Sequence, residues 1–540
     1  MYLAERWKMD ATGKDMAAAD AVGKTETKSD QHSEKRSCCL LADKIPARYV
    51  LAALFFVGHV SMIISRGGFA LAVVVMVNSS SRVTPVNQTD TYQLCPSSGR
   101  GNTSSQNDQG ELDWSESVKG VVLGAYFYGY IFTQVVGGML EQRLGGRIVY
   151  GTSILLGAVL NVLCPVAART SPWAIFAVRF SIGLVTGVLF PSLYGIWGRW
   201  APPTERTKLL AICYMGLPLG NIINYPLASF LAAELGWEYI FYIPGATTAA
   251  WLLAWLLLAY DSPEKHPRIL KEEQKYIEEG IGIRGRQIPT VPWLKILASP
   301  AVWALIIGQF SSNWGVFFLT TQLPNYMQNV LGFNIQTNGL LSALPFVLAM
   351  VSMLASGAAA DRLIQGEKIP KVWIRRGFVI TGYSGMVICG VILANLSGCN
   401  PFTAVALLCI TQGFNGLTVA GFRAVHVEFA PRFSGVTFAL ANTGGTVSGI
   451  FAPLLVGLVT DNYPTPTAWS TIFYIGAAIQ GVGGIFTAVF MRTDIQPWAL
   501  GEPNVNDKSP ELAGSKDLVI ANEHAEMPMK AVGEMPNTKL

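Results

Sequence analysis

The stretch HVSMIISRGGFALAVVVMV, residues 59–77, is apolar enough to cross a membrane but carries Arg66 near its middle. An arginine at the centre of a transmembrane helix costs roughly 2.5–3.5 kcal/mol on insertion scales. No acidic residue lies in the same apolar segment to neutralise it. We therefore expect Arg66 to face a cavity and hold an anion, with a buried salt bridge or a side chain that snorkels to the membrane surface as the alternatives.

The rest of the chain repeats this apolar character. Of its 540 residues 51% are hydrophobic and only 14% are charged, whereas a soluble domain carries about a quarter charged residues. Windows of about 20 apolar residues mark transmembrane helices, so the sequence predicts an all-α membrane protein. The twelve predicted spans are 49–77, 117–140, 148–168, 173–197, 208–233, 239–260, 301–322, 338–360, 373–395, 402–424, 434–460 and 469–491.

Lysine and arginine gather in the loops that follow the even-numbered spans. By the positive-inside rule both tails, residues 1–47 and 492–540, are cytoplasmic, and their polar composition predicts disorder. The loop 78–116 then faces the lumen or the exterior, where its sequons predict glycosylation at Asn87 and Asn102. Cys95 and Cys399 fall on that same side, which leaves a disulfide between them open.

The two halves of the chain resemble each other. The matched positions, each pair 229 residues apart, are Ala201 and Ala430, Gly216 and Gly445, and Gly220 and Gly449. Repeats of this kind are typical of transporters that rock two bundles about a site near the membrane midplane. We expect six-helix bundles at 48–260 and 301–491, joined by a cytoplasmic linker at 261–300.

Several segments carry a family resemblance. GGMLEQRLGGR, which ends at Arg147, resembles the loop motif of the major facilitator superfamily, and Arg179-x-x-x-Gly183 resembles its span-4 signature. YFYGYIFTQVVGG, RWAPPTERTKL, GFRAVHVEFAPR and QPWAL are similar to the organic anion/cation symporters, and SNWGVFFL favours their sialin branch. The resemblance extends from the first span to Leu500. It implies the major facilitator fold and secondary transport of a small organic anion by alternating access.

The sequence also departs from that family. Sialin-like and glutamate-carrying members place a glutamate and a histidine where this chain has Thr186 and Tyr194, and glutamate-type members place an arginine where it has Ser312. An asparagine of the family's span-10 motif corresponds to Arg423. The substrate is therefore open among sialic acid or an acidic sugar, placed first, an acidic amino acid and phosphate. The coupling ion is open between H⁺, Na⁺ and voltage alone.

The resemblance and the polar residues within the spans together give the candidate site. The expected substrate-binding residues are Arg66, Tyr130, Tyr194, Asn313 and Trp314. His59 lies on the same helix face as Arg66 and is the proton-coupling candidate, although a hydrogen-bonded core histidine is the favoured alternative. The expected gate network, with solvated loop charges as the alternative, comprises Arg143, Arg147, Arg179, Glu205, Arg206, Asp361, Arg362, His426 and Glu428.

No catalytic or metal-binding motif is apparent. The sequence has no phosphate-binding loop, zinc-protease motif or nucleophile elbow, so we expect neither an enzyme nor a metal or other cofactor. The expected partners are a small organic anion and the lipid bilayer, without nucleic acid, and a monomer is expected to function. A lysosomal or secretory-vesicle membrane leads narrowly over the plasma membrane. A transporter-like sensor or scaffold and an anion channel are the competing functions.

Overall fold

The computed structural model describes residues 45–78, 110–202, 205–281, 291–396, 400–461 and 466–500. Within these ranges the secondary structure is helical, apart from one isolated bridge between Val77 and Leu112. The predicted glycosylation sites Asn87 and Asn102, and the cysteines Cys95 and Cys399, lie outside the described residues. Those expectations therefore stay predictions, as do the two disordered tails and the domain boundaries.

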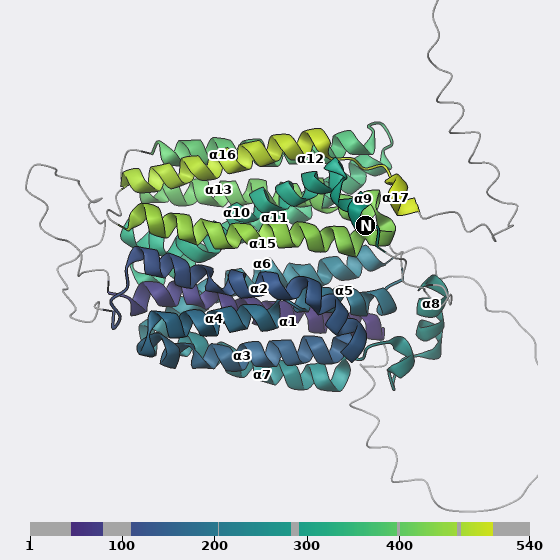
Figure 1. Ribbon diagram of the computed structural model, residues 1–540, viewed down its shortest axis with the longest axis horizontal. Coiled ribbons are helices and arrows are strands. Elements are labelled where there is room, and N and C mark those ends of the chain that lie inside the picture. Colours follow the sequence, from purple (N-terminus) through teal and green to yellow (C-terminus); the bar gives the residue numbers. More distant parts are fainter. Residues whose placement is uncertain are drawn as a thin grey trace, which may run out of the picture. The chain divides into compact units, whose positions relative to one another are not determined.

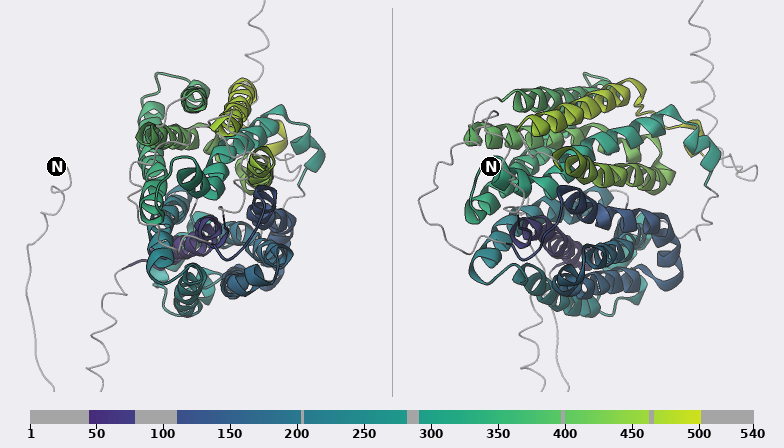
Figure 2. Two further views of the ribbon diagram at one scale, coloured as in Figure 1. Left: turned by 90° about the vertical axis from the view of Figure 1, so that its left-hand side faces the viewer. Right: turned by 60° about the vertical axis from the view of Figure 1, so that its left-hand side comes forward.

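The first half of the chain supplies the helices of one group. They are α1 (Ala47–Met76), α2 (Glu116–Leu144), α3 (Gly146–Thr170), α4 (Pro172–Thr186), α5 (Leu189–Trp200), α6 (Arg206–Glu234) and α7 (Tyr239–Leu258). A connecting segment follows, with η3 (Pro263–Lys265), α8 (Lys271–Ile281) and α9 (Trp293–Leu297). The first group lies together in Figures 1 and 2, in purple to blue-green.

The second half supplies the other group, drawn in green to yellow in Figures 1 and 2. Its helices are α10 (Pro300–Asn329), α11 (Ile335–Gln365), α12 (Lys371–Ala394), α13 (Pro401–Thr418), η4 (Val419–Arg423), α14 (Val425–Phe429), η5 (Pro431–Phe433), α15 (Ser434–Thr460), α16 (Pro466–Phe490) and α17 (Pro497–Leu500). The two groups, called here the N-terminal and C-terminal bundles, meet mainly where α2 packs on α15 and α6 packs on α11.

Ten helices within the described residues are long and apolar enough to span a membrane, or eleven if α2 counts as one bent span. That helix bends by 57° between Gln134 and Val136. Two of the ten are broken helices, α4–α5 and α13–η4–α14. The predicted span 208–233 coincides with α6, which is long enough but is not among the ten. Its apolar run is interrupted by Asn221 and Asn224.

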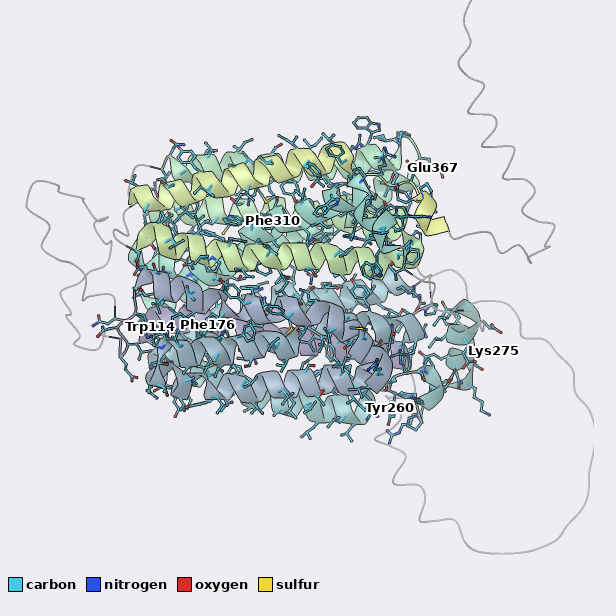
Figure 3. All side chains as sticks on the ribbon, in the orientation of Figure 1. Trp114, Phe176, Tyr260, Lys275, Phe310 and Glu367 are labelled. Carbon is cyan, nitrogen blue, oxygen red and sulfur yellow. The ribbon has the colours of Figure 1, made fainter. Side chains whose placement is uncertain are left out.

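The helices have two clearly separated ends. Figure 3 places Trp114, at the start of α2, at one end, and Tyr260, Lys275 and Glu367 at the other. We call these the Trp114 end and the α8 end. The described residues just before α2 therefore lie at the opposite end of the helices from α8.

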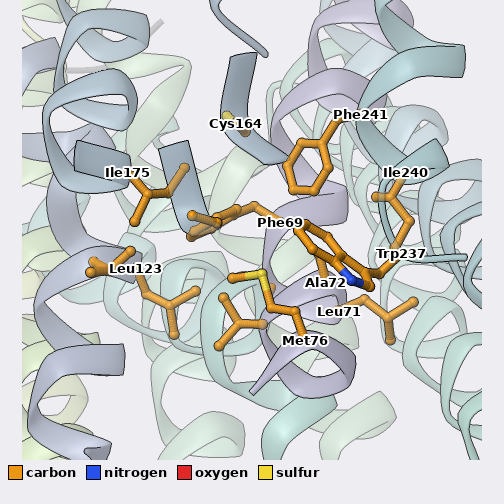
Figure 4. Packing of buried hydrophobic residues seen from close by; sticks show 14 of the residues in the cluster. Phe69, Leu71, Ala72, Met76, Leu123, Cys164, Ile175, Trp237, Ile240 and Phe241 are labelled. Carbon is orange, nitrogen blue, oxygen red and sulfur yellow. The ribbon is translucent and has the colours of Figure 1, made fainter. Parts of the chain in front are cut away.

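Small residues let the helices of the N-terminal bundle approach closely. Lipid is as apolar as a leucine side chain, so membrane helices gain little from apolar burial and depend on close packing instead. A Cβ added to Gly183 of α4 would lie 2.8 Å from the backbone nitrogen of Tyr130 and still closer to the carbonyl oxygen of Tyr126. The backbones of α2 and α4 thus touch at this point, which positions both helices around α1. Figure 4 shows the core beside it, built on Phe69 and Phe241.

Substituting Gly183 tests this packing. We expect Gly183→Val to force α2 and α4 apart and to lower the stability of the folded protein by roughly 1–3 kcal/mol, the usual cost of overpacking. The measurement is thermal unfolding of detergent-purified protein, followed by size-exclusion chromatography. Gly357→Val is the matched control, because a Cβ on Gly357 meets nothing within 4 Å. Equal losses in both variants would contradict this account.

Candidate functional site

Arg66 lies in α1 between aromatic rings rather than beside an acid. Its guanidinium carbon is 4.9 Å from the ring centroid of Tyr126 and 6.0 Å from that of Phe127, both on α2. Among the described residues no salt bridge includes Arg66. The electron-rich faces of the two rings attract the cation and partly offset its desolvation, but they leave its full positive charge available to an anion.

A second arginine lies directly against it. Arg179 of α4 is only 4% exposed, and its guanidinium carbon is 4.1 Å from the ring centroid of Phe69. One Nη atom donates to the carbonyl oxygen of Arg66 at 3.5 Å, while Nε and the other Nη are buried without a partner. From the sequence, Arg179 is expected in the gate network. The structure places it instead in the middle of the N-terminal bundle.

The two arginines line a cavity of about 30 Å³. Its polar lining comprises Arg66, Tyr126, Arg179, Asn221, Thr320 and Thr321. A second cavity of about 20 Å³ lies on the other side of Arg66 and is lined by Ser65, Asn161, Thr186 and Thr248 among others. Thr320 and Thr321 belong to α10, so the first cavity lies between the two bundles.

This arrangement favours a bound anion. Two cations that share one cavity repel each other, and in a poorly hydrated interior that repulsion is relieved most directly by a negative charge between them. The remaining polar lining is neutral, so the cavity has no competing carboxylate. A volume of about 30 Å³ holds only one or two water molecules. An organic anion fits there only after the bundles move apart.

The other predicted substrate residues lie outside this cavity. Tyr130 stacks on Tyr126 with the ring centroids 5.5 Å apart, and so supports the cavity wall from behind. Tyr194 is on α5, beyond the break in span 4; its hydroxyl accepts a hydrogen bond of 2.9 Å from Tyr214. Its ring is 5.3 Å from that of Phe438. Tyr194 thus joins the two bundles nearer the α8 end.

Asn313 and Trp314 belong to the C-terminal bundle. The Oδ1 atom of Asn313 accepts from Gln309 at 3.1 Å and from Arg423 at 3.3 Å. Trp314 is 5% exposed and packs in a core cluster with Phe318. Neither residue lines the cavity at Arg66.

His59 is a buried histidine on α1, about one helical turn from Ile63, which lines the cavity. It is 1% exposed, and its Nδ1 donates to the carbonyl oxygen of Phe55 at 2.9 Å. Its ring lies against Phe190 and Tyr214, while Nε2 has no partner. This is the hydrogen-bonded core histidine that the sequence analysis favoured, with one ring nitrogen still free.

Two of the expected gate residues, Glu205 and Glu428, form salt bridges. Glu205 is 2.8 Å from Arg48, which also pairs with Glu273 of α8 at 2.9 Å. Glu428 pairs with Arg375 at 2.6 Å. Every salt bridge among the described residues lies within one bundle, within α8, or between α8 and the N-terminal bundle, so no described ion pair connects the two bundles.

The remaining predicted gate residues are placed as follows. Arg143, Asp361 and Arg362 are exposed and form no salt bridge within the described ranges. The backbone N–H of Arg147 donates to Asp261 at 2.8 Å, and its guanidinium carbon is 4.7 Å from the ring centroid of Tyr260. Arg206 donates to the carbonyl oxygen of Ala201, and His426 is buried against Thr437.

At the Trp114 end, Arg169 joins the start of α2 to the start of α7. It pairs with Glu111 at 2.9 Å and also with Glu238. The hydrogen bond from Arg169 is the main cause that lowers the pKa of the Glu111 carboxyl. At the α8 end, burial lowers the pKa of His266. Neither group is near the cavity.

Sequence reasoning weighed Tyr126 against ordinary helix packing and left it out of the expected substrate-binding residues, and it missed Asn221 and the position of Arg179. Arg179 carries the same signal as Arg66, a lone arginine in an apolar span, and that criterion applied evenly selects it. It also missed Arg48, Glu273 and Arg375, whose charges are ordinary for helix ends. Their pairing depends on contacts 53–225 residues apart in the chain.

Comparison with known proteins assigns the family. Residues 55–453 match the Major Facilitator Superfamily. The chain belongs to this superfamily. It is 36% identical to human sialin over 458 residues, which cover 84% of this chain and 91% of sialin. It is 33% identical to human vesicular glutamate transporter 2 over 469 residues, 86% of this chain and 77% of that protein.

Solved structures share the same fold. A bacterial homologue of the human lysosomal transporter Spinster, in an inward-facing and unoccupied conformation, superposes with a TM-score of 0.59 at 13% identity. The match covers 84% of this chain and 99% of that one. The expected fold class, a helical membrane protein of the major facilitator type, and the expected resemblance to sialin are thereby confirmed.

Replacing Arg179 tests whether its charge stabilises the folded protein. Replacing a buried ion pair with apolar side chains of similar volume is often neutral or stabilising by about 1–4 kcal/mol, and a buried charge without a carboxylate partner has less to offset its desolvation. We therefore expect Arg179→Met to raise the thermal unfolding midpoint of the purified protein without added anion. Arg375→Met is the matched control. It should lower the midpoint through a loss of about 3–5 kcal/mol in unfolding free energy, because Glu428 would lose its nearest cationic partner. A midpoint that falls alike in both variants would make Arg179 a structural residue.

Proposed function

We propose that the protein is a secondary active transporter that moves a small organic anion across a membrane by alternating access. The observation that carries this proposal is the pair Arg66 and Arg179, two cations without a carboxylate partner that line one cavity between the bundles. Membership of the Major Facilitator Superfamily and the similarity to sialin and vesicular glutamate transporter 2 support it.

A carboxylate suits this site best. The guanidinium fork of an arginine pairs with both oxygens of a carboxylate, and charge-assisted hydrogen bonds of this kind are about twice as strong as neutral ones. Thr320, Thr321 and Asn221 add neutral groups that can bond the hydroxyls or amides of an organic anion. Sialic acid or an acidic sugar is the first candidate, with acidic amino acids and phosphate behind it.

Hydrogen bonds join the bundles on both sides of the cavity, and in the half nearer the α8 end Gln134 of α2 bonds with Thr446 and Asn442 of α15. Near the Trp114 end the bundles are joined by three hydrogen bonds: the backbone N–H of Ser117 to Asp461, Tyr225 to the carbonyl oxygen of Thr320, and Ser229 to that of Ile335. The side-chain contacts that Ser229 and Tyr225 of α6 make with α11 lie in this half of the two helices. By the positive-inside rule the α8 end is cytoplasmic, so alternating access would break the contacts of one half at a time and expose the anion site to the cytoplasm or to the opposite side.

The finer parts of the proposal concern energy and place. A lysosomal or secretory-vesicle membrane is favoured, in keeping with the name of the vesicular glutamate transporter relative. The driving force is a gradient of H⁺ or Na⁺ or the membrane potential, with His59 as the candidate proton carrier because its Nε2 is free. The transporter is proposed to work as a monomer and to need no cofactor.

Uptake into proteoliposomes tests the proposal. Full-length protein is given labelled sialic acid, glutamate or phosphate under imposed pH, sodium and voltage gradients. We expect saturable accumulation of at least one anion. Arg66→Ala should weaken that anion's affinity roughly tenfold to a hundredfold, the equivalent of about 1.5–3 kcal/mol for a hydrogen bond to a charged group, and Arg66→Lys should weaken it less.

Arg492→Gln is the control, because Arg492 is an exposed charge at the end of the last long helix. Binding of an anion without accumulation in the wild type would favour the sensor instead. Currents without saturable uptake would favour an anion channel. Unchanged affinity in a well-expressed Arg66→Ala variant would remove Arg66 from the site.

Replacing His59 separates the coupling modes. If His59 carries the proton, we expect His59→Gln to abolish accumulation driven by a pH gradient while uptake driven by voltage continues, because glutamine cannot titrate. Both are measured in the same proteoliposomes. Strong proton-driven accumulation that persists in His59→Gln would exclude His59 as the carrier.

A further inference from the structure

The C-terminal bundle holds an arginine of its own, Arg423, which has no acidic partner among the residues that the structure describes. Arg423 ends the π-helical segment η4, and one of its Nη atoms donates to Ser312 Oγ and to Asn313 Oδ1, both at 3.3 Å. Both acceptors are neutral. The Nε atom of Arg423 is buried and has no hydrogen-bond partner. Single π-helical turns of this kind are frequent at functional sites.

The first carboxylate after Arg423 in the sequence, that of Glu428, is already paired with other cations. Glu428 pairs with Arg375 at 2.6 Å and lies 3.9 Å from Lys371. Arg375 also donates to the carbonyl oxygen of Ala420 at 2.6 Å, a backbone group within η4. The wide helical turn is therefore held by Arg375, and Glu428 is not available to Arg423.

Two further polar atoms around Arg423 lack partners. His426 follows it by three residues, and its Nε2 is buried and unbonded while Nδ1 meets Thr437. Gln309 bonds to Asn313 through Nε2, but its Oε1 is unpartnered. The ring of His426 is 5.6 Å from that of Phe438, which contacts Tyr194 of the other bundle. The unpartnered groups thus lie near the surface where the bundles meet.

Helix α10 relates this arginine to the cavity at Arg66. Asn313, Phe317 and Thr320 lie on one face of α10, and Asn313 and Thr320 are separated by about 10 Å of helix. Asn313 contacts Arg423, and Thr320 lines the cavity at Arg66. Between them, the ring of Phe317 is 4.6 Å from that of Phe127. This aromatic pair separates the two cationic sites along the helix.

We propose that Arg423 forms a second anion-binding site, contributed by the C-terminal bundle and oriented by Ser312 and Asn313. Its ligand is a carboxylate or a halide. Asn313 is nearer than Thr320 to the start of α10, at the α8 end, so an anion that enters from that end meets Arg423 first and Arg66 after the Phe127–Phe317 pair. The proposal rests on the proposed transport function only for this order of events, and not for the binding itself.

Anion binding at equilibrium tests the second site without any transport step. Full-length protein in lipid nanodiscs is titrated with sodium acetate and sodium chloride, against sodium sulfonate buffers of equal ionic strength, and the thermal unfolding midpoint is recorded. We expect Arg66→Gln to retain part of the anion-dependent stabilisation, and the double variant Arg66→Gln/Arg423→Gln to need at least tenfold more anion for the same shift. Arg66→Gln/Arg492→Gln is the matched control and should behave as Arg66→Gln.

Two results would overturn the proposal. One is an Arg66→Gln protein that has lost all anion-dependent stabilisation, and the other is a double variant that titrates like Arg66→Gln alone. Because the test measures binding, a wild-type protein that binds anions but accumulates none would contradict the transport proposal without contradicting this one.

A chemical rescue covers the case in which Arg423→Gln folds poorly. Arg423→Cys is made in the Arg66→Gln background, with Cys38, Cys39, Cys95 and Cys399 replaced by serine. The substituted thiol is then converted to a mixed disulfide by an aminoethyl or a sulfonatoethyl methanethiosulfonate, with sulfinate as the leaving group. The attached ammonium should lower the anion concentration needed for the same shift at least tenfold, and the attached sulfonate should not. Equal effects of the two reagents would contradict a role for the charge.

Discussion

An uncompensated positive charge inside an apolar helix bundle is the constraint on which this structure depends. Arg66 and Arg179 are surrounded by aromatic rings and neutral oxygens, and the described ion pairs all lie elsewhere. Such a charge is costly in a membrane, by several kcal/mol or more. The aromatic faces lower that cost without removing it. The site is therefore most stable when a negative charge from outside the protein completes it.

The construction of the bundle follows from that constraint. Glycines bring α2 and α4 into backbone contact, which places Tyr126 on α2 over Arg66 and leaves Arg179 on α4 beside it. Polar side chains reach the cavity from α6 and α10 as well. Because α10 belongs to the other bundle, occupancy of the cavity and the relative position of the bundles are physically linked.

Much of the fold could be predicted from the sequence because the membrane imposes a simple length rule on apolar helices. The same rule says little about which face of a helix meets which neighbour. Arg66 could be predicted as a site residue because an arginine in an apolar span is costly whichever helices surround it. Tyr130 was expected at the cavity, but its neighbour one turn away, Tyr126, lines it. Tyr194 was displaced because span 4 breaks between α4 and α5, a feature that hydropathy does not record.

The confinement of the ion pairs to single bundles, or to one bundle and α8, has a consequence for the energetics of opening. Apart from the hydrogen bond of the Ser117 backbone to the Asp461 carboxylate, the described contacts that separate when the bundles part are neutral. They include the hydrogen bonds of Gln134 with Thr446 and Asn442 and the ring contact of Tyr194 with Phe438. Salt screens interactions between charges and leaves neutral contacts almost unaffected. Ionic strength should therefore change how strongly the protein attracts its anion while leaving the balance between its open and closed forms nearly constant.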